Sequence, residues 1–360
     1  MLVASGLVAC SDATSGPSPA SPRPSPSAVE SPADSASPEP LPDPTPTQEP
    51  DDGATTGAGG NRADRLPPVR HRVSLAALMR QRLGPTRVRF QRLQGAAAAY
   101  TRHEVTYRSG DLTVSGVLLR PRGRGPFPGI VLNHGYIDPA FYVTGQGLAR
   151  EQDWLARAGF VVLHTDYRGH ARSDPIPARD RETRLGYTLD AINAVRALKR
   201  EPYVDGDRMA MLGRSMGGGV TLNALVVRPG LVDAAVVYAS VSSRFLTNLR
   251  HFTQRNRPEA VESLFARFGT PREEPAFYRG LSSRTHFDRV TEPVLMHHGT
   301  ADETCPFPWA RTTQRLLTEA GADSRLEVYE GERHAFVPQW QDSIEATVRF
   351  LRRELGPNRG

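Results

Sequence analysis

Cysteine is scarce in this chain of 360 residues, which has two, Cys10 and Cys305. A framework of several disulfides is therefore excluded, and a chain of this length can bury an adequate core without one. Lysine is scarcer still, because Lys199 is the single lysine and arginine carries the rest of the positive charge. The formal net charge is +6. No motif for nucleic-acid binding accompanies the arginines, so we interpret most of them as solvated surface residues.

Long apolar runs are also missing, and no segment has the length and apolarity needed to span a bilayer. The first ten residues end in Leu7-Val8-Ala9-Cys10, which resembles the signal of a bacterial lipoprotein. We therefore expect residues 1–10 to be such a signal, with Cys10 lipidated and the protein anchored to the outside of the cell membrane. The alternative is a disordered apolar N-terminus with an incidental cysteine.

Residues 11–65 contain no aromatic residue and are rich in Pro, Ser, Ala and Thr. Such a segment cannot bury enough apolar surface to fold, so we expect a disordered tether. Its proline repeats favour an extended, semi-rigid spacer. Residues 66–99 are expected to be an N-terminal extension of the folded part.

From about residue 100 to 360, short apolar strands alternate with amphipathic helices. This pattern is typical of an α/β fold, with a mostly parallel sheet of about eight strands and helices on both faces. Residues 242–289 interrupt the alternation, and we expect them to form a small cap. The expected strands cover 103–108, 112–119, 129–133, 160–166, 208–212, 234–239, 293–297 and 325–329. The expected helices cover 147–158, 183–200, 217–227 and 339–355.

Gly213-Arg214-Ser215-Met216-Gly217 stands between the strand expected at 208–212 and a helix of small residues. In this setting a Gly-x-Ser-x-Gly motif predicts a nucleophile elbow, a turn so tight that the residues flanking the serine must lack side chains. We therefore predict that Ser215 is a nucleophile at the carboxyl edge of the sheet. The alternative is a glycine-rich turn whose serine has no chemical role.

A serine hydroxyl needs a base to take its proton, and the base needs an acid to hold its tautomer. Asp302 follows the strand expected at 293–297, and His334 follows the last expected strand. Loops after parallel strands meet at one edge of a sheet, so we predict that Asp302 and His334 are the acid and the base.

Other residues compete for these positions. Glu303 and Asp288 are alternative acids, although the shorter Asp302 fits a tight loop better than Glu303. Cys305 lies beside the acid loop, but no elbow surrounds it, so we expect a small buried side chain. The remaining candidate bases are interpreted as core or loop residues: His164, His170, His286, His297 and His298.

A tetrahedral intermediate also needs two N–H donors for its oxyanion. We predict that one is the backbone N–H of Met216, directly after the serine. The second is predicted to be the N–H of Tyr136, in the loop Asn133-His134-Gly135-Tyr136 after the strand at 129–133. Asn133 and His134 are expected to brace that loop.

With these residues in place, the chain resembles the α/β-hydrolase superfamily and, within it, the prolyl oligopeptidase group, over roughly residues 100–355. Further matching stretches are Asp166-Tyr167-Arg168-Gly169-His170, Phe268-Gly269-Thr270-Pro271, Asp288-Arg289-Val290 and His298-Gly299 with Asp302 and Pro306. The resemblance implies an α/β-hydrolase fold, acylation of Ser215, and hydrolysis by water activated through His334. It implies no metal and no cofactor.

The expected substrate is a small peptide or an acyl ester. Many peptidases of the group carry Tyr after the serine, where this chain has Met216, so the resemblance supports acyl hydrolysis better than peptide cleavage. One alternative is a carboxylesterase with no peptidase activity. Another is a surface lipoprotein whose hydrolase fold has no catalytic activity. The sequence does not indicate an oligomeric state.

Overall fold

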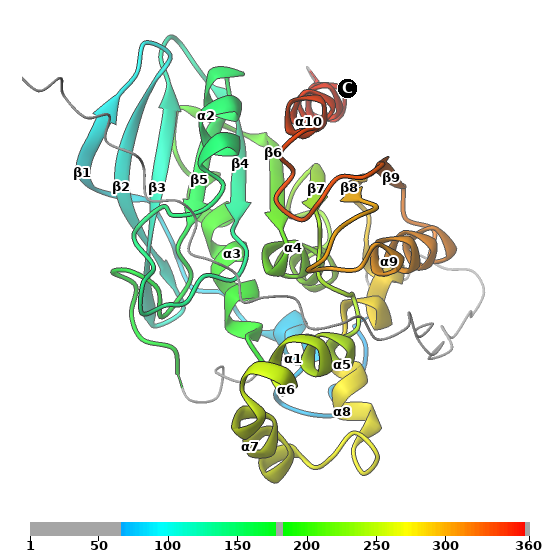
Figure 1. The fold of residues 1–360 in the computed structure, drawn as a ribbon. Coiled ribbons are helices and arrows are strands. Elements are labelled where there is room, and N and C mark those ends of the chain that lie inside the picture. Colours follow the sequence, from blue (N-terminus) through cyan, green and yellow to red (C-terminus); the bar gives the residue numbers. More distant parts are fainter. Residues whose placement is uncertain (1–65, 178–182, 357–360) are drawn as a thin grey trace, which may run out of the picture. The chain divides into compact units, whose positions relative to one another are not determined.

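The computed structural model describes residues 66–177 and 183–356. The expected signal, Cys10 and the expected tether lie outside these residues. The described part contains a sheet of nine strands in the order β1-β2-β3-β5-β4-β6-β7-β8-β9 (Figure 1). These strands are β1 (Arg89–Ala96), β2 (Tyr100–Ser109), β3 (Leu112–Pro121), β4 (Phe127–Asn133), β5 (Val161–Thr165), β6 (Val204–Arg214), β7 (Ala234–Tyr238), β8 (Val294–Gly299) and β9 (Ser324–Tyr329).

The sheet is antiparallel on one side and parallel on the other. The strands β1, β2, β3 and β5 pair antiparallel, and the pairs from β5 through β4 to β9 are parallel. Of the parallel strands, β5, β7 and β8 are short and buried along their whole length, as strands covered by helices on both faces are expected to be. The mostly parallel sheet and the α/β fold predicted from the sequence are therefore confirmed, with nine strands rather than about eight.

Helices cover both faces of the sheet. One face packs against α3 (Leu185–Leu198), α4 (Met216–Val227) and α9 (Phe307–Glu319), and the other against α2 (Ala149–Arg157) and α10 (Trp340–Glu354). Side chains of a strand alternate between faces, so β6 sends Met209 and Met211 into the first core and Ala210 and Leu212 into the second.

The additional strand is β1, within the segment expected to be only an extension. Every residue of β1 is exposed, and it pairs antiparallel with β2 through two register shifts. A strand at the edge of a sheet with both faces exposed has no alternation of apolar and polar residues, which is why the sequence pattern did not reveal it. The short helix α1 (Leu75–Arg80) precedes it and packs on α4.

Residues 245–289 form a series of short helices, which gather at the lower end of the view in Figure 1. They are α5 (Phe245–Asn248), η3 (Leu249–Thr253), α6 (Gln254–Asn256), α7 (Pro258–Phe268), α8 (Pro275–Gly280) and η4 (Ser283–Arg289). We call these helices the cap. The ring of His251 in η3 lies 3.2 Å from the carbonyl oxygen of Thr304, so the cap contacts the loop that follows β8.

Helix α4 begins directly against the sheet, and glycine is required there. A Cβ atom on Gly217 would overlap the carbonyl group of Asn133 at the end of β4. We predict that Gly217→Ala lowers the free energy of unfolding by about 1–3 kcal/mol, because the added methyl group forces the helix away from the strand. Urea unfolding followed by circular dichroism measures this change.

Gly84→Ala is the matched control, since a Cβ atom on Gly84 meets no atom within 4 Å. Equal stabilities of the two variants would contradict the close approach of α4 to β4.

Candidate active site

Three loops carry the predicted site residues to one edge of the sheet. Ser215 follows β6, Asp302 follows β8 and His334 follows β9. These three strands are parallel to one another through β7, so their carboxyl ends share an edge. The fold therefore brings residues far apart in the sequence to the same side of the molecule, where ligand sites of open α/β sheets lie.

Ser215 has the backbone conformation expected of an elbow. Its φ is 55° and its ψ is −122°, a left-handed region that costs a non-glycine residue about 1–3 kcal/mol. The strain is held by backbone hydrogen bonds, from Ser215 N–H to the oxygen of Tyr238 (2.9 Å) and from Gly218 N–H to the oxygen of Ser215 (2.9 Å). A Cβ atom on Gly213 would overlap the backbone of Gly217, so both glycines of the motif are needed for this turn.

The imidazole of His334 lies against the carboxylate of Asp302. His334 Nδ1 is 3.0 Å from Oδ1 and 2.9 Å from Oδ2 of Asp302. The contact fits a proton on Nδ1 that the carboxylate accepts, which leaves Nε2 to act as a base. Asp302 is buried, whereas the His334 side chain retains some exposure to solvent.

The surroundings of Asp302 keep it ionised. Burial alone would raise its pKa, but hydrogen bonds from His298 and His334 and the backbone N–H of Cys305 hold the pKa of Asp302 well below its usual range. The N–H groups of Thr304 and Cys305 donate to Oδ1 at 2.9 and 2.8 Å. A carboxylate with this many donors stays charged and can stabilise a protonated imidazole.

The two alternative acids are placed differently. Glu303 accepts hydrogen bonds from the backbone N–H of His334 (3.3 Å) and from the guanidinium of Arg333 (3.4 Å), so it touches the histidine loop but not the imidazole. Asp288 is exposed at the end of η4 and forms no hydrogen bond with His334. Of the three acids, Asp302 is the one in contact with the ring.

The other histidines weighed as bases have structural surroundings. His297 is buried between the hydroxyls of Tyr329 (2.9 Å) and Thr347 (3.0 Å), and burial lowers its pKa to about 3. Burial also lowers the pKa of His286, to about 4, and that of His164 well below the usual value. Neutral, enclosed imidazoles of this kind are core residues.

Cys305 is fully buried next to the elbow. Burial raises the pKa of its thiol well above the usual value, and the charge of Asp302 raises it further, although a hydrogen bond with Ser215 opposes both. A thiol held in its protonated form is a poor nucleophile. Cys305 is therefore a small packing residue that contacts the serine.

The predicted oxyanion donors have free N–H groups. No hydrogen bond of the described residues uses the backbone N–H of Tyr136 or of Met216. Gly135 passes so close to the elbow that a Cβ atom there would lie 3.2 Å from Cβ of Ser215. The loop after β4 and the start of α4 thus face each other across the serine, as an oxyanion hole requires.

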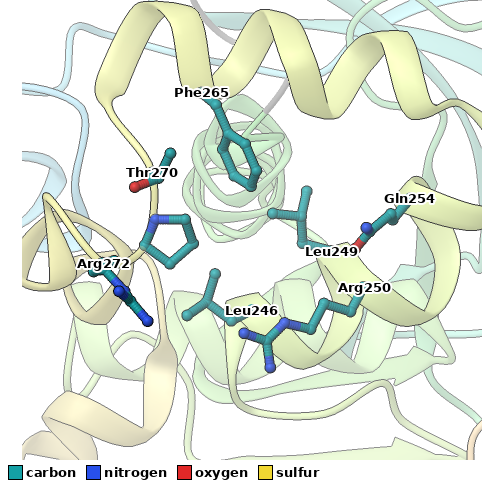
Figure 2. A pocket seen from close by; sticks show the side chains of 8 residues that line it. Leu246, Leu249, Arg250, Gln254, Phe265, Thr270 and Arg272 are labelled. Atoms are coloured by element: carbon teal, nitrogen blue, oxygen red, sulfur yellow. The ribbon is translucent and has the colours of Figure 1, made fainter.

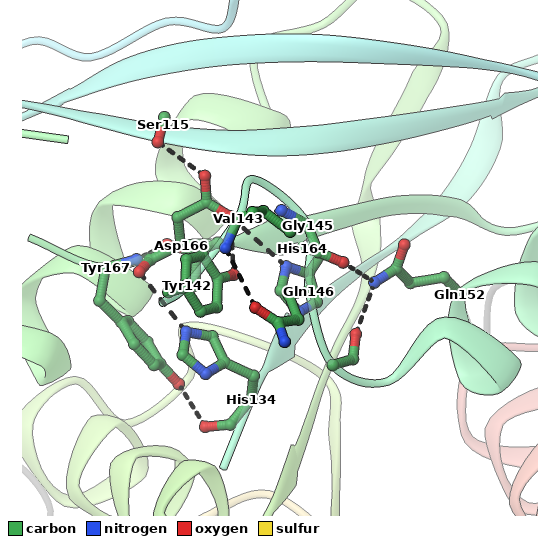
Figure 3. Close-up of polar contacts among 12 residues, drawn as sticks. Ser115, His134, Tyr142, Val143, Gly145, Gln146, Gln152, His164, Asp166 and Tyr167 are labelled. Atoms are coloured by element: carbon green, nitrogen blue, oxygen red, sulfur yellow. Dashed lines mark hydrogen bonds and ion pairs between the residues drawn. The ribbon is translucent and has the colours of Figure 1, made fainter. Parts of the chain in front are cut away.

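The loop after β4 packs against a buried polar cluster (Figure 3). The ring of His134 stacks on Tyr142, with ring centroids 4.7 Å apart, and burial lowers its pKa to about 3, so the imidazole is neutral. Asp166 accepts hydrogen bonds from the hydroxyls of Ser115 (2.6 Å) and Tyr142 (2.8 Å) and from the N–H of Gly145 (2.8 Å). These contacts fix the position of the backbone that leads to Tyr136.

Ser215 and His334 are not joined by a hydrogen bond in the described part of the chain. Catalytic hydrogen bonds in enzymes without substrate are often long and tighten when substrate binds. The lack of a hydrogen bond between Ser215 Oγ and His334 Nε2 is therefore compatible with proton transfer between them once substrate is bound.

Arg214 and its partners hold the loop that carries His334, and the sequence did not predict these contacts. We call them the clamp. Arg214, the residue before the serine, donates to the carbonyl oxygen of Ala335 (3.1 Å) and forms an ion pair with the buried Glu151 (3.0 Å). The indole N–H of Trp340 donates to the same carboxylate at 3.0 Å. The motif contains Arg214, but nothing in the sequence indicates that its partners lie on α2 and beyond β9.

The cap contains a cavity of about 310 Å³ (Figure 2). Its wall combines apolar side chains with two arginines, and the ring of Phe265 lies opposite Leu246 and the guanidinium of Arg250. The lining residues are Leu246, Leu249, Arg250, Gln254, Phe265, Thr270, Pro271 and Arg272. Within residues 66–177 and 183–356, no group of His, Cys, Asp and Glu side chains is arranged to hold a metal ion.

The model of the prolyl oligopeptidase family matches residues 147–358, more than half of the chain. An uncharacterized peptidase of Bacillus subtilis (strain 168), YtmA, is 27% identical over 243 residues, which cover 66% of this chain and 87% of the relative. Dipeptidyl aminopeptidase BIII of Pseudoxanthomonas mexicana is 27% identical over 256 residues, 69% of this chain but 36% of that protein.

Among solved structures, an acetyl xylan esterase from Paenibacillus sp. R4 aligns with a TM-score of 0.60 at 20% identity, covering 77% of this chain and 92% of the esterase. This likeness shows the α/β-hydrolase fold. Since the family model spans more than half of the sequence, the chain belongs to the prolyl oligopeptidase family and is a serine hydrolase.

Proposed function

We propose that Ser215, His334 and Asp302 form a catalytic triad that hydrolyses esters or peptide bonds of small substrates through an acyl-enzyme on Ser215. The observation that carries the proposal is the contact of His334 Nδ1 with the ionised Asp302 on the edge where the strained Ser215 stands. The resulting activity is that of a peptidase or an esterase.

Acylation follows from this arrangement. His334 Nε2 takes the proton of Ser215 Oγ as the oxygen attacks the substrate carbonyl, and Asp302 stabilises the imidazolium that forms. The negative charge on the carbonyl oxygen is received by the N–H groups of Tyr136 and Met216, which have no other acceptor among the described residues. His334 then gives its proton to the leaving group as the tetrahedral intermediate collapses to the acyl-enzyme.

Deacylation repeats the steps with water. His334 removes a proton from a water molecule, the resulting hydroxide attacks the acyl carbon, and Ser215 leaves with the proton returned by His334. Esters and peptides differ in the leaving group that must be protonated in the first half. An esterase without peptidase activity would therefore differ from a peptidase in the acylation step, and deacylation would be the same in both.

The triad is tested with a fluorophosphonate probe, which reacts with an activated serine. We predict that the wild-type protein is labelled and that Ser215→Ala is not, because the phosphorus forms its bond to Ser215 Oγ. The readout is fluorescence of the protein band after electrophoresis.

Asp302→Asn and Glu303→Gln form a matched pair in the same assay. Labelling is expected to slow strongly in Asp302→Asn, which loses the negative charge and offers an NH2 donor that favours the wrong tautomer of His334, and to change little in Glu303→Gln. Equal labelling of wild type and Ser215→Ala would reject the triad and favour a non-catalytic protein.

The clamp on the histidine loop gives a second expectation. Arg214→Met removes one of the two arginine donors to the carbonyl of Ala335, the other being Arg150, and leaves Glu151 buried without its cation. We predict a fall of at least about tenfold in kcat for a p-nitrophenyl ester, since a small displacement of a catalytic group is costly. We also predict a loss of about 3–5 kcal/mol in the free energy of unfolding.

Glu151→Gln in the Arg214→Met background separates the two effects. It removes the unpaired charge, so stability should recover while kcat stays low. An unchanged kcat in Arg214→Met would show that the clamp does not position His334.

We further propose that Cys10 carries a lipid that anchors the protein to the outer side of a bacterial cell membrane. The support is Leu7-Val8-Ala9-Cys10 with the proline-rich stretch after it. In the part of the chain that the structure describes, no helix is long and apolar enough to cross a membrane.

The anchor predicts a change of location. Cys10→Ala, expressed in a bacterium that lipidates such signals, should move the protein from the membrane fraction to the soluble fraction or the medium. Immunoblots of the separated fractions measure this. Membrane retention of Cys10→Ala would exclude the lipid at Cys10 as the anchor.

A further inference from the structure

Arg184 reaches the proposed oxyanion site from the residue before α3. Its guanidinium carbon lies 5.0 Å from the centroid of the Tyr136 ring, and Nη1 donates to the sulfur of Met216 at 3.3 Å. These two residues are the ones whose N–H groups are proposed to bind the oxyanion. The guanidinium therefore contacts the side chains of both residues whose backbone N–H groups are proposed to bind the oxyanion.

The backbone at Arg184 is held in an unfavourable conformation. Its φ is 56° and its ψ is 15°, in the left-handed region, and its side chain does not cap the helix that follows. Such strain in a residue other than glycine gathers at functional sites. Ser215 is another of the described residues other than glycine that have a positive φ.

Among the described residues, Arg184 has no carboxylate partner of the kind that other arginines near the site have. Arg168 forms a two-pronged ion pair with Asp190 (2.9 and 2.8 Å), and Arg214 pairs with Glu151. In the described part of the chain, Arg184 contacts a thioether and an aromatic ring but no carboxylate or carbonyl oxygen. A thioether is a weak acceptor, so most donors of this half-buried guanidinium have no partner among the described residues.

The cap supplies a second cation whose charge acts on Arg184. Burial lowers the pKa of Arg184, and the charge of Arg257, between α6 and α7, lowers it further. The side chain of Arg257 forms no hydrogen bond or ion pair with any described residue. The two like charges repel each other, and an anion bound at Arg184 would relieve the repulsion and give the guanidinium oxygen acceptors.

We propose that Arg184 binds a carboxylate of the substrate close to the reacting carbonyl, and that Arg257 attracts the same group. The proposal rests on the proposed function of Ser215 and narrows its substrates to acyl compounds with a negative charge near the scissile bond. A guanidinium suits this purpose because its planar fork matches the two oxygens of a carboxylate.

The test compares anionic esters with neutral esters of similar size. On the acyl side the pair is mono-p-nitrophenyl glutarate and p-nitrophenyl pentanoate, with spontaneous hydrolysis subtracted. On the leaving-group side it is 4-acetoxybenzoate and 4-acetoxybenzamide. We expect the wild type to prefer the anionic ester of at least one pair by about tenfold or more in kcat/KM, as a hydrogen bond to a charged group provides.

Arg184→Gln should abolish this preference, mainly through a higher KM for the anionic ester, and Arg184→Lys should retain part of it. Arg257→Gln should reduce it by a smaller factor, and salt should weaken it in the wild type. The control is Arg124→Gln, at an exposed residue between β3 and β4 with no side-chain partner in the described chain. Its preference should equal that of the wild type.

Two results would overturn the proposal. One is a wild type without preference in either pair. The other is an equal loss for anionic and neutral esters in Arg184→Gln, which would mean that Arg184 only holds Tyr136 and Met216 in place. An equal recovery of kcat/KM for the anionic and the neutral ester in Arg184→Lys would lead to the same conclusion.

A binding measurement separates this inference from the proposed function. Ser215→Ala cannot form the acyl-enzyme, so thermal shifts with each ester report binding alone. If the wild type turns over no ester but Ser215→Ala is stabilised more by the anionic ester, the catalytic proposal fails and the anion site stands. Equal shifts by anionic and neutral esters, together with turnover, would leave the triad standing and reject the anion site.

Discussion

The closeness of α4 to the sheet is the constraint on which the rest of the site depends. Gly217 meets the carbonyl group of Asn133 where any side chain would collide with it, and Gly213 meets the backbone of Gly217. With these side chains missing, the chain can pass from strand to helix in one residue, and Ser215 takes up the left-handed conformation. The same approach brings the loop after β4 next to the serine, so the proposed nucleophile and the proposed oxyanion donors are positioned by one packing contact.

Two buried groups near this contact show how hydrogen bonds decide the charge of a buried side chain. Burial disfavours the charged form of both Asp302 and His134. Asp302 receives donors from His298, His334 and two backbone N–H groups, which more than offset burial, so it stays ionised. His134 has two backbone carbonyl oxygens as neighbours, which favour the charged ring too weakly to overcome burial. The acid is therefore charged where an imidazolium forms, and the oxyanion loop adds no charge of its own.

The order of strands and helices in the α/β domain could be predicted because apolar periodicity and glycine placement are local properties. The positions of Ser215, Asp302 and His334 followed from the rule that loops after parallel strands share an edge. The strand β1 could not be predicted, since an exposed edge strand leaves no apolar pattern. Nor could the clamp of Arg214, because its partners on α2 and after β9 are 63 and 121 residues away in the sequence.

The arginines show most clearly which contacts the sequence does not predict. In a chain with a single lysine, nearly all cationic roles fall to arginine. In the sequence, Arg168, Arg184 and Arg214 look alike, each close to a motif of the site. The structure distinguishes them by their partners. Arg168 forms an ion pair with Asp190 and Arg214 forms one with Glu151, so their charges are neutralised inside the protein and stabilise its loops. Among the described residues Arg184 contacts a thioether and an aromatic ring, which is why we propose that its charge serves a bound anion. The partners in the structure, which the composition cannot reveal, therefore separate arginines with a structural role from one whose charge is left for a proposed ligand.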